Sequence, residues 1–136
     1  MPAYTWVATY NVAWWAGCRV VPVDVRLDTF CMDMSSLAHA IARETQEESG
    51  GPRAMAVLPV HKFGYRCGQE EDEIAADISL ESLARRHNLT VIGDACCAFA
   101  SVSQTQLCGS WTPVECTSFH PRKVLTTGEG RAVFRR

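Results

Sequence analysis

The stretch that decides the fold is residues 79–94, which read SLESLARRHNLTVIGD. In residues 79–87, apolar side chains recur every three or four positions with charged ones between them, which predicts an amphipathic helix. Residues 89–92 then form a short apolar and β-branched run, which is typical of a buried strand. Asp94 follows this strand directly. A helix that leads straight into a buried strand is the repeating unit of an α/β protein.

The same alternation extends toward the N-terminus. Residues 5–16 hold apolar side chains at near-helical spacing, and Gly17 is suited to end that helix because glycine readily adopts the left-handed backbone. A second helix is expected around residues 37–41. Its N-cap would be Ser35 or Ser36, because serine hydroxyls accept hydrogen bonds from the first free backbone N–H groups of a helix.

A second buried strand is predicted at residues 54–60, AMAVLPV, because this apolar run is continuous. Residues 47–53 precede it and contain Ser-Gly-Gly-Pro, which predicts a loop. Strands that alternate with helices favour a parallel sheet with helices on both faces. We therefore expect one α/β domain built on a mostly parallel sheet flanked by helices.

Composition limits the class of protein. An apolar share of 47% over 136 residues supports a real core and excludes a disordered chain. Lys plus Arg number 13 and Asp plus Glu number 15, and a net charge of −2 does not indicate a nucleic-acid surface. An acidic stretch at residues 70–81 is expected to be a solvated surface. We find neither a membrane-spanning run nor a signal peptide, and so expect a cytoplasmic protein.

The seven cysteines do not follow a metal-binding pattern. Their number is odd, no two have the C-x₂-C spacing of a zinc site, and adjacent Cys96 and Cys97 cannot easily bind one ion together. In a cytoplasmic protein, thiols are reduced by default. The sequence therefore predicts no metal site and no structural disulfide.

Two residues are candidates for chemistry. Asp94 lies just past a strand, where ligands bind in open α/β sheets, although an Asp after a strand is more often a helix N-cap. Lys123 lies in SFHPRKVLTTGEG, residues 118–130, although a single Lys is usually a solvated surface charge. Pro121 and the glycines of this stretch restrict Lys123 to a turn. Spacing alone leaves both interpretations open.

Six motifs, taken together, identify a family. They are PAYTWVAT (2–9), VPVDV (21–25), LPVHKFG (58–64), LARRHNL (83–89), VIGDA (91–95) and SFHPRKVLTTGEG (118–130), in this order. From end to end, the chain closely resembles the DegT/DnrJ/EryC1/StrS family of pyridoxal-phosphate-dependent sugar aminotransferases. The resemblance implies a type I aminotransferase fold, in which this chain would be part of the large, cofactor-binding domain.

The resemblance also implies roles for single residues. Lys123 is similar to the lysine that forms a Schiff base with pyridoxal phosphate, and Asp94 to the aspartate that pairs with the pyridine nitrogen. Trp6 matches the aromatic residue that stacks on the cofactor ring, and Ser118 the serine that contacts the phosphate. Cys97 matches the position of the polar residue that the family has near the cofactor oxygen. These roles are chemically sensible, because a carboxylate at the ring nitrogen makes the ring an electron sink.

The chain departs from the family pattern at several positions. Cys97 stands where Gln or His is usual, and a thiol is a weaker hydrogen-bond partner. Gly93 replaces the usual acidic residue before the aspartate, and Arg131 stands where a glycine is typical. Residues 66–75 resemble an insertion.

The expected extent is partial. Family members resemble chains more than twice this length, and residues 1–136 match only a central part of the large domain. The upstream Gly-Thr segment that contacts the cofactor phosphate and the C-terminal small domain have no counterpart here. We therefore expect a fragment of an enzyme that is a homodimer with its active sites at the subunit interface.

Three functional hypotheses follow. The first is an aminotransferase that moves an amino group, commonly from glutamate, to a keto-sugar, typically nucleotide-linked, in cell-surface polysaccharide or antibiotic sugar biosynthesis. Lys123 favours transamination over the family's dehydratases, in which a histidine replaces the lysine. The second hypothesis is a non-catalytic remnant of the family. The third is a flavodoxin-like binding domain or a thiol redox protein that uses Cys96 and Cys97, which does not explain residues 118–130.

Overall fold

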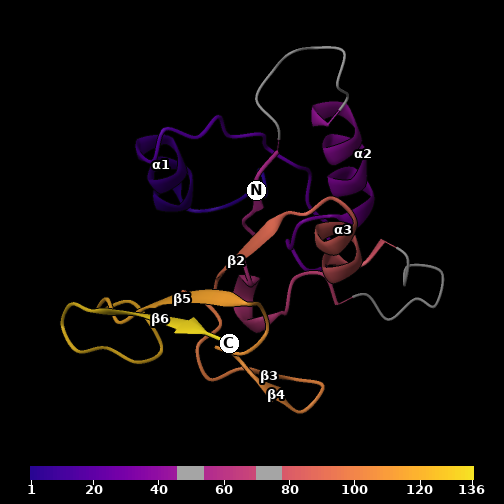
Figure 1. The fold of residues 1–136 in the computed structure, drawn as a ribbon. Coiled ribbons are helices and arrows are strands. Elements are labelled where there is room, and N and C mark those ends of the chain that lie inside the picture. The colour runs from indigo at the N-terminus through magenta and orange to yellow at the C-terminus, as the bar shows by residue number, and fades with distance from the viewer. Residues whose placement is uncertain (46–53, 70–77) are drawn as a thin grey trace.

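A four-stranded sheet forms the centre of the computed structural model, which describes residues 1–45, 54–69 and 78–136 (Figure 1). The strand order is β1-β2-β5-β6. These strands span Ala56–Val57, Thr90–Asp94, Val114–Ser118 and Arg131–Arg135. β1, β2 and β5 run parallel, whereas β6 is antiparallel to β5. The prediction of a mostly parallel α/β sheet is confirmed.

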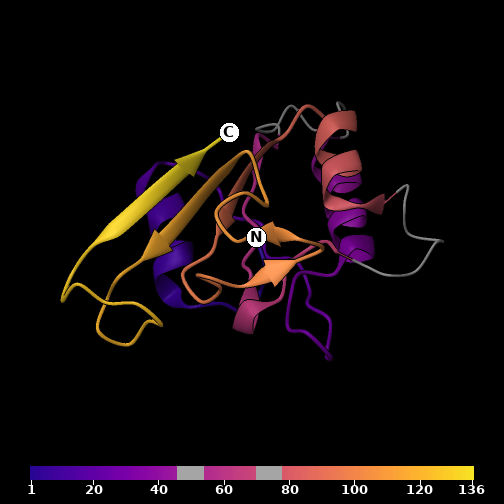
Figure 2. The same cartoon turned by 90° about the horizontal axis from the view of Figure 1, so that it is seen from below.

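Three α-helices accompany this sheet in the described part of the chain. They are α1 (Val7–Trp15), α2 (Met34–Glu44) and α3 (Leu80–Arg86). α1 falls within the helix expected at residues 5–16, and Gly17 just after it has φ 78°. α3 matches the predicted helix closely, with Ser79 as its N-cap. Figure 2 shows α2 and α3 together on one side of the molecule, with α1 apart from them on the other side.

The main core lies where α2 and α3 pack against β1 and β2. Leu37, Ile41, Leu80, Leu83 and Val91 are among its buried members, together with Val57 of β1 and Leu89 before β2. This packing explains the helical spacing seen in the sequence, because each helix turns its apolar side to the sheet. Among the described residues, no helix is long and apolar enough to cross a bilayer.

The predicted N-cap of α2 is wrong. The cap is Asp33, whose carboxylate accepts a hydrogen bond from the backbone N–H of Ser36 at 2.7 Å. Ser35 and Ser36 lie inside the first turn. Asp and Ser are about equally good caps, so the choice depends on where the chain leaves its extended conformation, and Asp33 has the extended backbone of a cap (φ −75°, ψ 125°).

The predicted strand at residues 54–60 is much shorter than expected. β1 contains only Ala56 and Val57, and it is an edge strand, so Ala56 is exposed. Pro59 has no N–H to donate to the ladder, and pairing resumes only at an isolated bridge between Val60 and Asp94. The expectation of a strand buried on both faces is therefore wrong, because a continuous apolar run does not reveal which strand lies at an edge.

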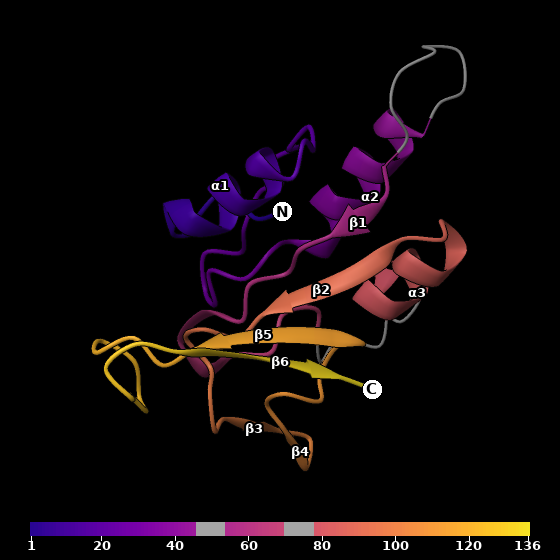
Figure 3. The same cartoon turned by 60° about the vertical axis from the view of Figure 1, so that its left-hand side comes forward.

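A small hairpin completes the described structure. β3 (Val102–Ser103) and β4 (Gln106–Leu107) pair antiparallel, on the opposite side of the sheet from α1 (Figure 3). The loop expected at residues 47–53 lies entirely outside the described residues. So does most of the acidic stretch and of the expected insertion. Of the acidic stretch, the described Glu81 is largely exposed and forms an ion pair with Arg66 at 3.0 Å.

Candidate functional site

Asp94 is the last residue of β2, and both of its carboxylate oxygens are held. Oδ2 accepts a hydrogen bond from the Thr9 hydroxyl at 2.8 Å, and Oδ1 accepts one from the backbone N–H of Cys96 at 3.0 Å. The backbone is fixed as well, because the His61 N–H donates to the Asp94 carbonyl at 2.9 Å. The Cys96 contact shows that Asp94 does stabilise the turn after the strand. The Thr9 contact is additional and comes from a distant helix.

Lys123 lies in the loop between β5 and β6. Its backbone N–H donates to the carbonyl of His120 at 2.9 Å, which fixes a turn at this point. Its ammonium group donates to the Cys97 thiol, with Nζ 3.6 Å from Sγ. Cys97 belongs to the turn directly after β2. The loop that carries Lys123 therefore meets the turn that follows Asp94.

Cys96 links the two charged candidates electrostatically. Burial, together with the negative charge and hydrogen bond of Asp94, raises the pKa of its thiol to about 12, whereas Lys123 acts in the opposite direction. Asp94 and Lys123 therefore both act on one thiol. The parallel register of β2 and β5, with Asp94 opposite Cys116, places this group at the carboxyl ends of both strands. Ligands bind at this edge of an open α/β sheet.

Trp6 and Ser118 lie at the margin of this group. Trp6 precedes α1 by one residue, and its indole is 69% exposed. It lies one helical turn before Thr9, the residue that contacts Asp94. Ser118 ends β5, and its hydroxyl accepts a hydrogen bond from the His120 N–H at 3.3 Å. In the described part of the chain, neither side chain makes a hydrogen bond or ring contact with Asp94 or Lys123.

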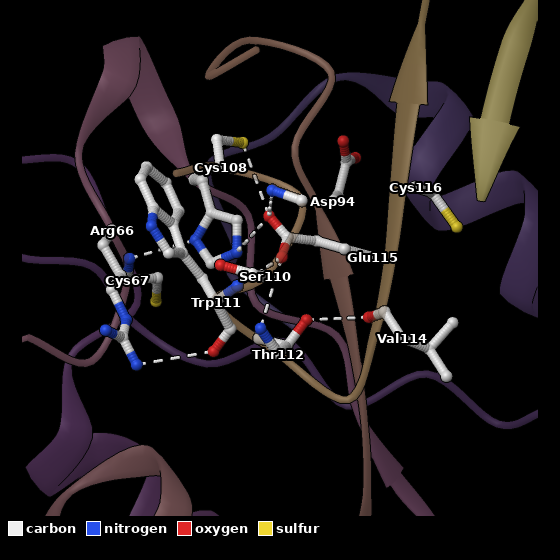
Figure 4. A network of polar contacts seen from close by, with 12 residues as sticks. Arg66, Cys67, Asp94, Cys108, Ser110, Trp111, Thr112, Val114, Glu115 and Cys116 are labelled. Atoms are coloured by element: carbon white, nitrogen blue, oxygen red, sulfur yellow. Dashed lines mark hydrogen bonds and ion pairs between the residues drawn. The ribbon is translucent and has the colours of Figure 1, made fainter. Parts of the chain in front are cut away.

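Beneath this edge lies a buried carboxylate that the sequence analysis did not single out (Figure 4). Glu115 of β5 is fully buried. Its Oε2 accepts hydrogen bonds from the backbone N–H groups of Trp111 at 2.8 Å and Thr112 at 3.2 Å. Its Oε1 accepts from the Gly109 N–H at 3.1 Å and the Cys108 thiol at 3.4 Å. These donors compensate the carboxylate for the loss of water.

His61 faces the same carboxylate and is also fully buried. Its Nδ1 accepts a hydrogen bond from the Cys67 N–H at 3.1 Å, and its Nε2 lies 3.7 Å from Oε1 of Glu115. Burial lowers the pKa of His61, and this effect outweighs the attraction of Glu115 and Asp94. We conclude that His61 is neutral at physiological pH and that its Nε2 carries the proton, since Nδ1 acts as an acceptor.

The position of Glu115 gives a physical reason for Gly93. Gly93 is paired with Glu115 in the sheet. A Cβ atom at position 93 would lie 2.5 Å from Oγ1 of Thr112, 3.0 Å from Cγ of Glu115 and 3.0 Å from Nε2 of His61. No side chain fits there without displacing buried groups. The acidic residue expected before the aspartate is thus absent from β2, and a carboxylate from β5 fills the space.

Sequence reasoning missed Thr9, His61 and Glu115. Thr9 carried a usable signal, because it lies one helical turn after Trp6 and so shares a face of the predicted helix with it. His61 was part of a quoted motif but had no evident partner. Glu115 lies among apolar and hydroxyl residues of a strand, and a charged residue there normally predicts an exposed position.

The fold and this edge of the sheet define an α/β protein of the type that binds ligands at the carboxyl ends of parallel strands. A family model for the DegT/DnrJ/EryC1/StrS aminotransferase family matches residues 1–136, and the chain belongs to that family. The resemblance noted in the sequence is confirmed.

Individual relatives agree with this assignment. GDP-perosamine synthase from Caulobacter vibrioides is 32% identical over 130 residues, which are 96% of this chain and 30% of that protein. A solved DegT/DnrJ/EryC1/StrS aminotransferase from Brucella abortus is also 32% identical, with a TM-score of 0.83 over 98% of this chain and 34% of that one. DesI, solved in the presence of its TDP-sugar product, gives a TM-score of 0.81 at 32% identity, over 99% of this chain and 30% of that one. The chain therefore spans about a third of the length of these relatives.

Proposed function

We propose that this chain is part of a pyridoxal-phosphate-dependent sugar aminotransferase and carries the residues that hold the cofactor and move protons. The observation that carries the proposal is the contact of Lys123 Nζ with the Cys97 thiol, which brings the Lys123 loop to the turn that directly follows Asp94. A family that matches the whole chain supports it. A thiol redox protein based on Cys96 is less favoured, because the high pKa of this thiol leaves it protonated and weakly nucleophilic.

The residues present fit pyridoxal phosphate. The Asp94 carboxylate accepts one hydrogen bond at each oxygen. An ionised carboxylate has about four acceptor sites, so one can still receive a pyridinium N–H. The Ser118 hydroxyl uses a lone pair toward His120 and keeps its own hydrogen for a phosphate oxygen. Exposed Trp6 leaves the face of its indole free for a flat ring.

The cofactor, when bound, would supply an electron sink for the carbon that loses a proton. In this chain, Asp94 would keep the ring nitrogen protonated, and Thr9 would hold the carboxylate in position. Lys123 would anchor the cofactor and then carry the proton at Nζ. Cys97 would lie beside that amine. Its thiol is a weaker hydrogen-bond partner than Gln or His, so its hydrogen bond to the cofactor oxygen would be weaker.

The substrate that we propose is a keto-sugar, typically nucleotide-linked, with glutamate as the amino donor. The names of two relatives support the sugar class: one is a GDP-perosamine synthase, and DesI was solved with a TDP-sugar product. Biosynthesis of cell-surface polysaccharide or antibiotic sugars is the matching setting. A cytoplasmic location remains part of this proposal.

We further propose that the whole enzyme is a homodimer. α1 supports this proposal, because only Thr9 of this helix is buried. Its apolar side chains are largely exposed, with Trp14 at 63% and Trp15 at 74%. Contiguous apolar surface of this kind typically marks a protein interface.

The test of the cofactor site is covalent trapping, and the chain is well suited to it because it contains only two lysines, Lys62 and Lys123. The purified chain is incubated with excess pyridoxal phosphate, followed by visible absorbance, and reduced with borohydride. Peptide mapping by mass spectrometry should locate the adduct at Lys123. Lys123→Ala should abolish this adduct, because the amine that forms the bond is gone.

Lys62→Ala is the matched control. Lys62 lies elsewhere, with its Nζ 5.0 Å from the centre of the Tyr4 ring, and its loss should leave the Lys123 adduct unchanged. Equal labelling of both lysines would indicate nonspecific amine chemistry and would contradict the proposed site. Absence of any Lys123 adduct at high cofactor concentration would favour the non-catalytic remnant.

A further inference from the structure

Two buried thiols outside the proposed cofactor site lie against each other. Cys31 and Cys67 belong to loops far apart in the sequence and are 4% and 2% exposed. The Cys31 thiol donates to the carbonyl of Tyr65 at 3.8 Å, and the Cys67 thiol donates to the carbonyl of Met32 at 4.0 Å. Each thiol thus points at a backbone carbonyl within two residues of the other cysteine. Cys67 also lowers the pKa of Cys31, so the two thiols lie within interaction range of each other.

The Cys31 residue lines a cavity. This cavity has a volume of about 560 Å³, which is within the usual range for small-molecule sites. Its lining includes Cys31, Arg26, Asp28 and Arg66, but Cys67 is not part of it. A small molecule in the cavity would therefore meet Cys31 first. Both guanidinium groups of this lining already have acidic partners, Arg26 with Asp28 at 2.7 Å and Arg66 with Glu81 at 3.0 Å.

The surroundings of Cys31 also favour its thiolate. The hydrogen bond from Cys67 lowers the pKa of Cys31 to about 7, helped by Lys62 and Thr29 and opposed by burial. The buried thiol of Cys108 shows the contrast, because burial and the nearby Glu115 raise its pKa to about 12. Thiolates, not thiols, are the nucleophiles in disulfide exchange. Among these buried cysteines, Cys31 is the one prepared for that reaction.

We propose that Cys31 and Cys67 form a reversible disulfide through exchange with a small disulfide of the glutathione type. The Cys31 thiolate attacks one sulfur of the small disulfide, which forms a mixed disulfide and releases one small thiolate. Cys67 then gives its proton to that thiolate and attacks the Cys31 sulfur. This releases the second small thiolate, which takes up from water the proton that Cys31 had lost on ionisation. The two protein thiols are oxidised, and the small disulfide is reduced to two thiols.

This bond would act close to the cofactor site. It would tie the loop around residues 26–32 to the loop around residues 65–68. The Cys67 N–H holds His61, and the His61 N–H holds the carbonyl of Asp94. The inference itself does not depend on the proposed aminotransferase activity, since it concerns the thiols alone.

The test is peptide mapping of the wild-type chain. The reduced chain is exposed to mixtures of oxidised and reduced glutathione, quenched with acid and alkylated, and its peptides are identified by mass spectrometry. A cross-linked peptide pair containing Cys31 and Cys67 should form with the loss of two hydrogens and should disappear when dithiothreitol is added. Exclusive modification of Cys18 or Cys97, which are exposed, would overturn the proposal.

Variants separate the roles of the two thiols. Cys67→Ala should stop the reaction at the mixed disulfide and increase the trapped glutathione adduct on Cys31 by about tenfold or more, because the resolving thiol is missing. Cys31→Ala should give neither species at Cys67. Cys18→Ala is the control and should leave the cross-linked pair unchanged. Equal glutathione labelling of Cys67 in the Cys31→Ala chain would contradict the assigned order of attack.

Discussion

At the scale of single residues, Gly93 and Glu115 form a matched pair across two strands. Glu115 is held by backbone N–H groups of the segment that precedes β5, so its carboxylate orders that segment. Its aliphatic stem occupies the space beside Gly93. Removing the Glu115 carboxylate would leave buried N–H groups without an acceptor, and a side chain at position 93 would displace that carboxylate. Either change would lower the free energy of unfolding.

Gly93→Ala should therefore lower the free energy of unfolding by about 2 kcal/mol or more, as expected for an overpacked core. The added methyl group would come within 2.5 Å of Oγ1 of Thr112, and Thr112 is itself buried. Urea denaturation of the two chains measures the difference.

A second variant checks the mechanism. In a Thr112→Ala background the closest contact is gone, so Gly93→Ala should cost at least about 1 kcal/mol less than in the wild type, as coupled neighbours do. Additive effects of the two substitutions would show that the contact with Thr112 is not the source of the cost.

At the scale of elements, α2 depends on a cap that the sequence made ambiguous. Asp33, Ser35 and Ser36 are all good cap residues within four positions. In the structure, the Asp33 carboxylate accepts the capping hydrogen bond from the Ser36 N–H. The backbone N–H of Asp33 in turn donates to the carbonyl of Asp24 at 2.9 Å. That second contact fixes the backbone of Asp33 outside the helix and so decides which residue caps it.

Asp33→Ala should reduce the free energy of unfolding by about 1 kcal/mol, because one N–H at the start of α2 loses its partner and the negative charge near the helix N-terminus is removed. Thermal or urea unfolding followed by circular dichroism measures the change. Ser35→Ala is the matched control and should change stability by less than about 0.5 kcal/mol, since it lies inside the first turn. A larger effect of Ser35→Ala than of Asp33→Ala would contradict the assigned cap.

At the scale of the whole molecule, the buried pair of His61 and Glu115 makes stability depend on pH. Burial keeps the native pKa of His61 below its ordinary value of 6.5, so the folded chain keeps this ring neutral. The unfolded chain takes up a proton as the pH falls through about 6.5. Because the unfolded chain binds this proton more strongly than the folded chain does, a lower pH favours unfolding. The stabilising contribution of the neutral His61 is therefore present above about pH 6.5 and is lost as the pH falls below it.

The free energy of unfolding should therefore fall between pH 6.5 and pH 5 with a slope of at most about 1.4 kcal/mol per pH unit for this one group. Urea titrations at a series of pH values give the slope. His61→Gln keeps an acceptor for the Cys67 N–H and should flatten the curve in this window, whereas His39→Gln, on the exposed face of α2, should not. A wild-type curve that is flat from pH 7 to pH 5 would contradict the neutral, buried His61.

The sequence by itself determined the order and type of α1, α2, α3 and β2, because the spacing of apolar residues within each segment can be read directly from the sequence. It also determined the family, through motifs that are contiguous. Only the tertiary structure decided the length of β1, whose edge position and Pro59 end the pairing early. It alone brought Thr9 to Asp94, which are 85 positions apart, Glu115 to Gly93, and Cys31 to Cys67. These contacts depend on strand register and on how loops cross, and neither leaves a periodic trace in the sequence.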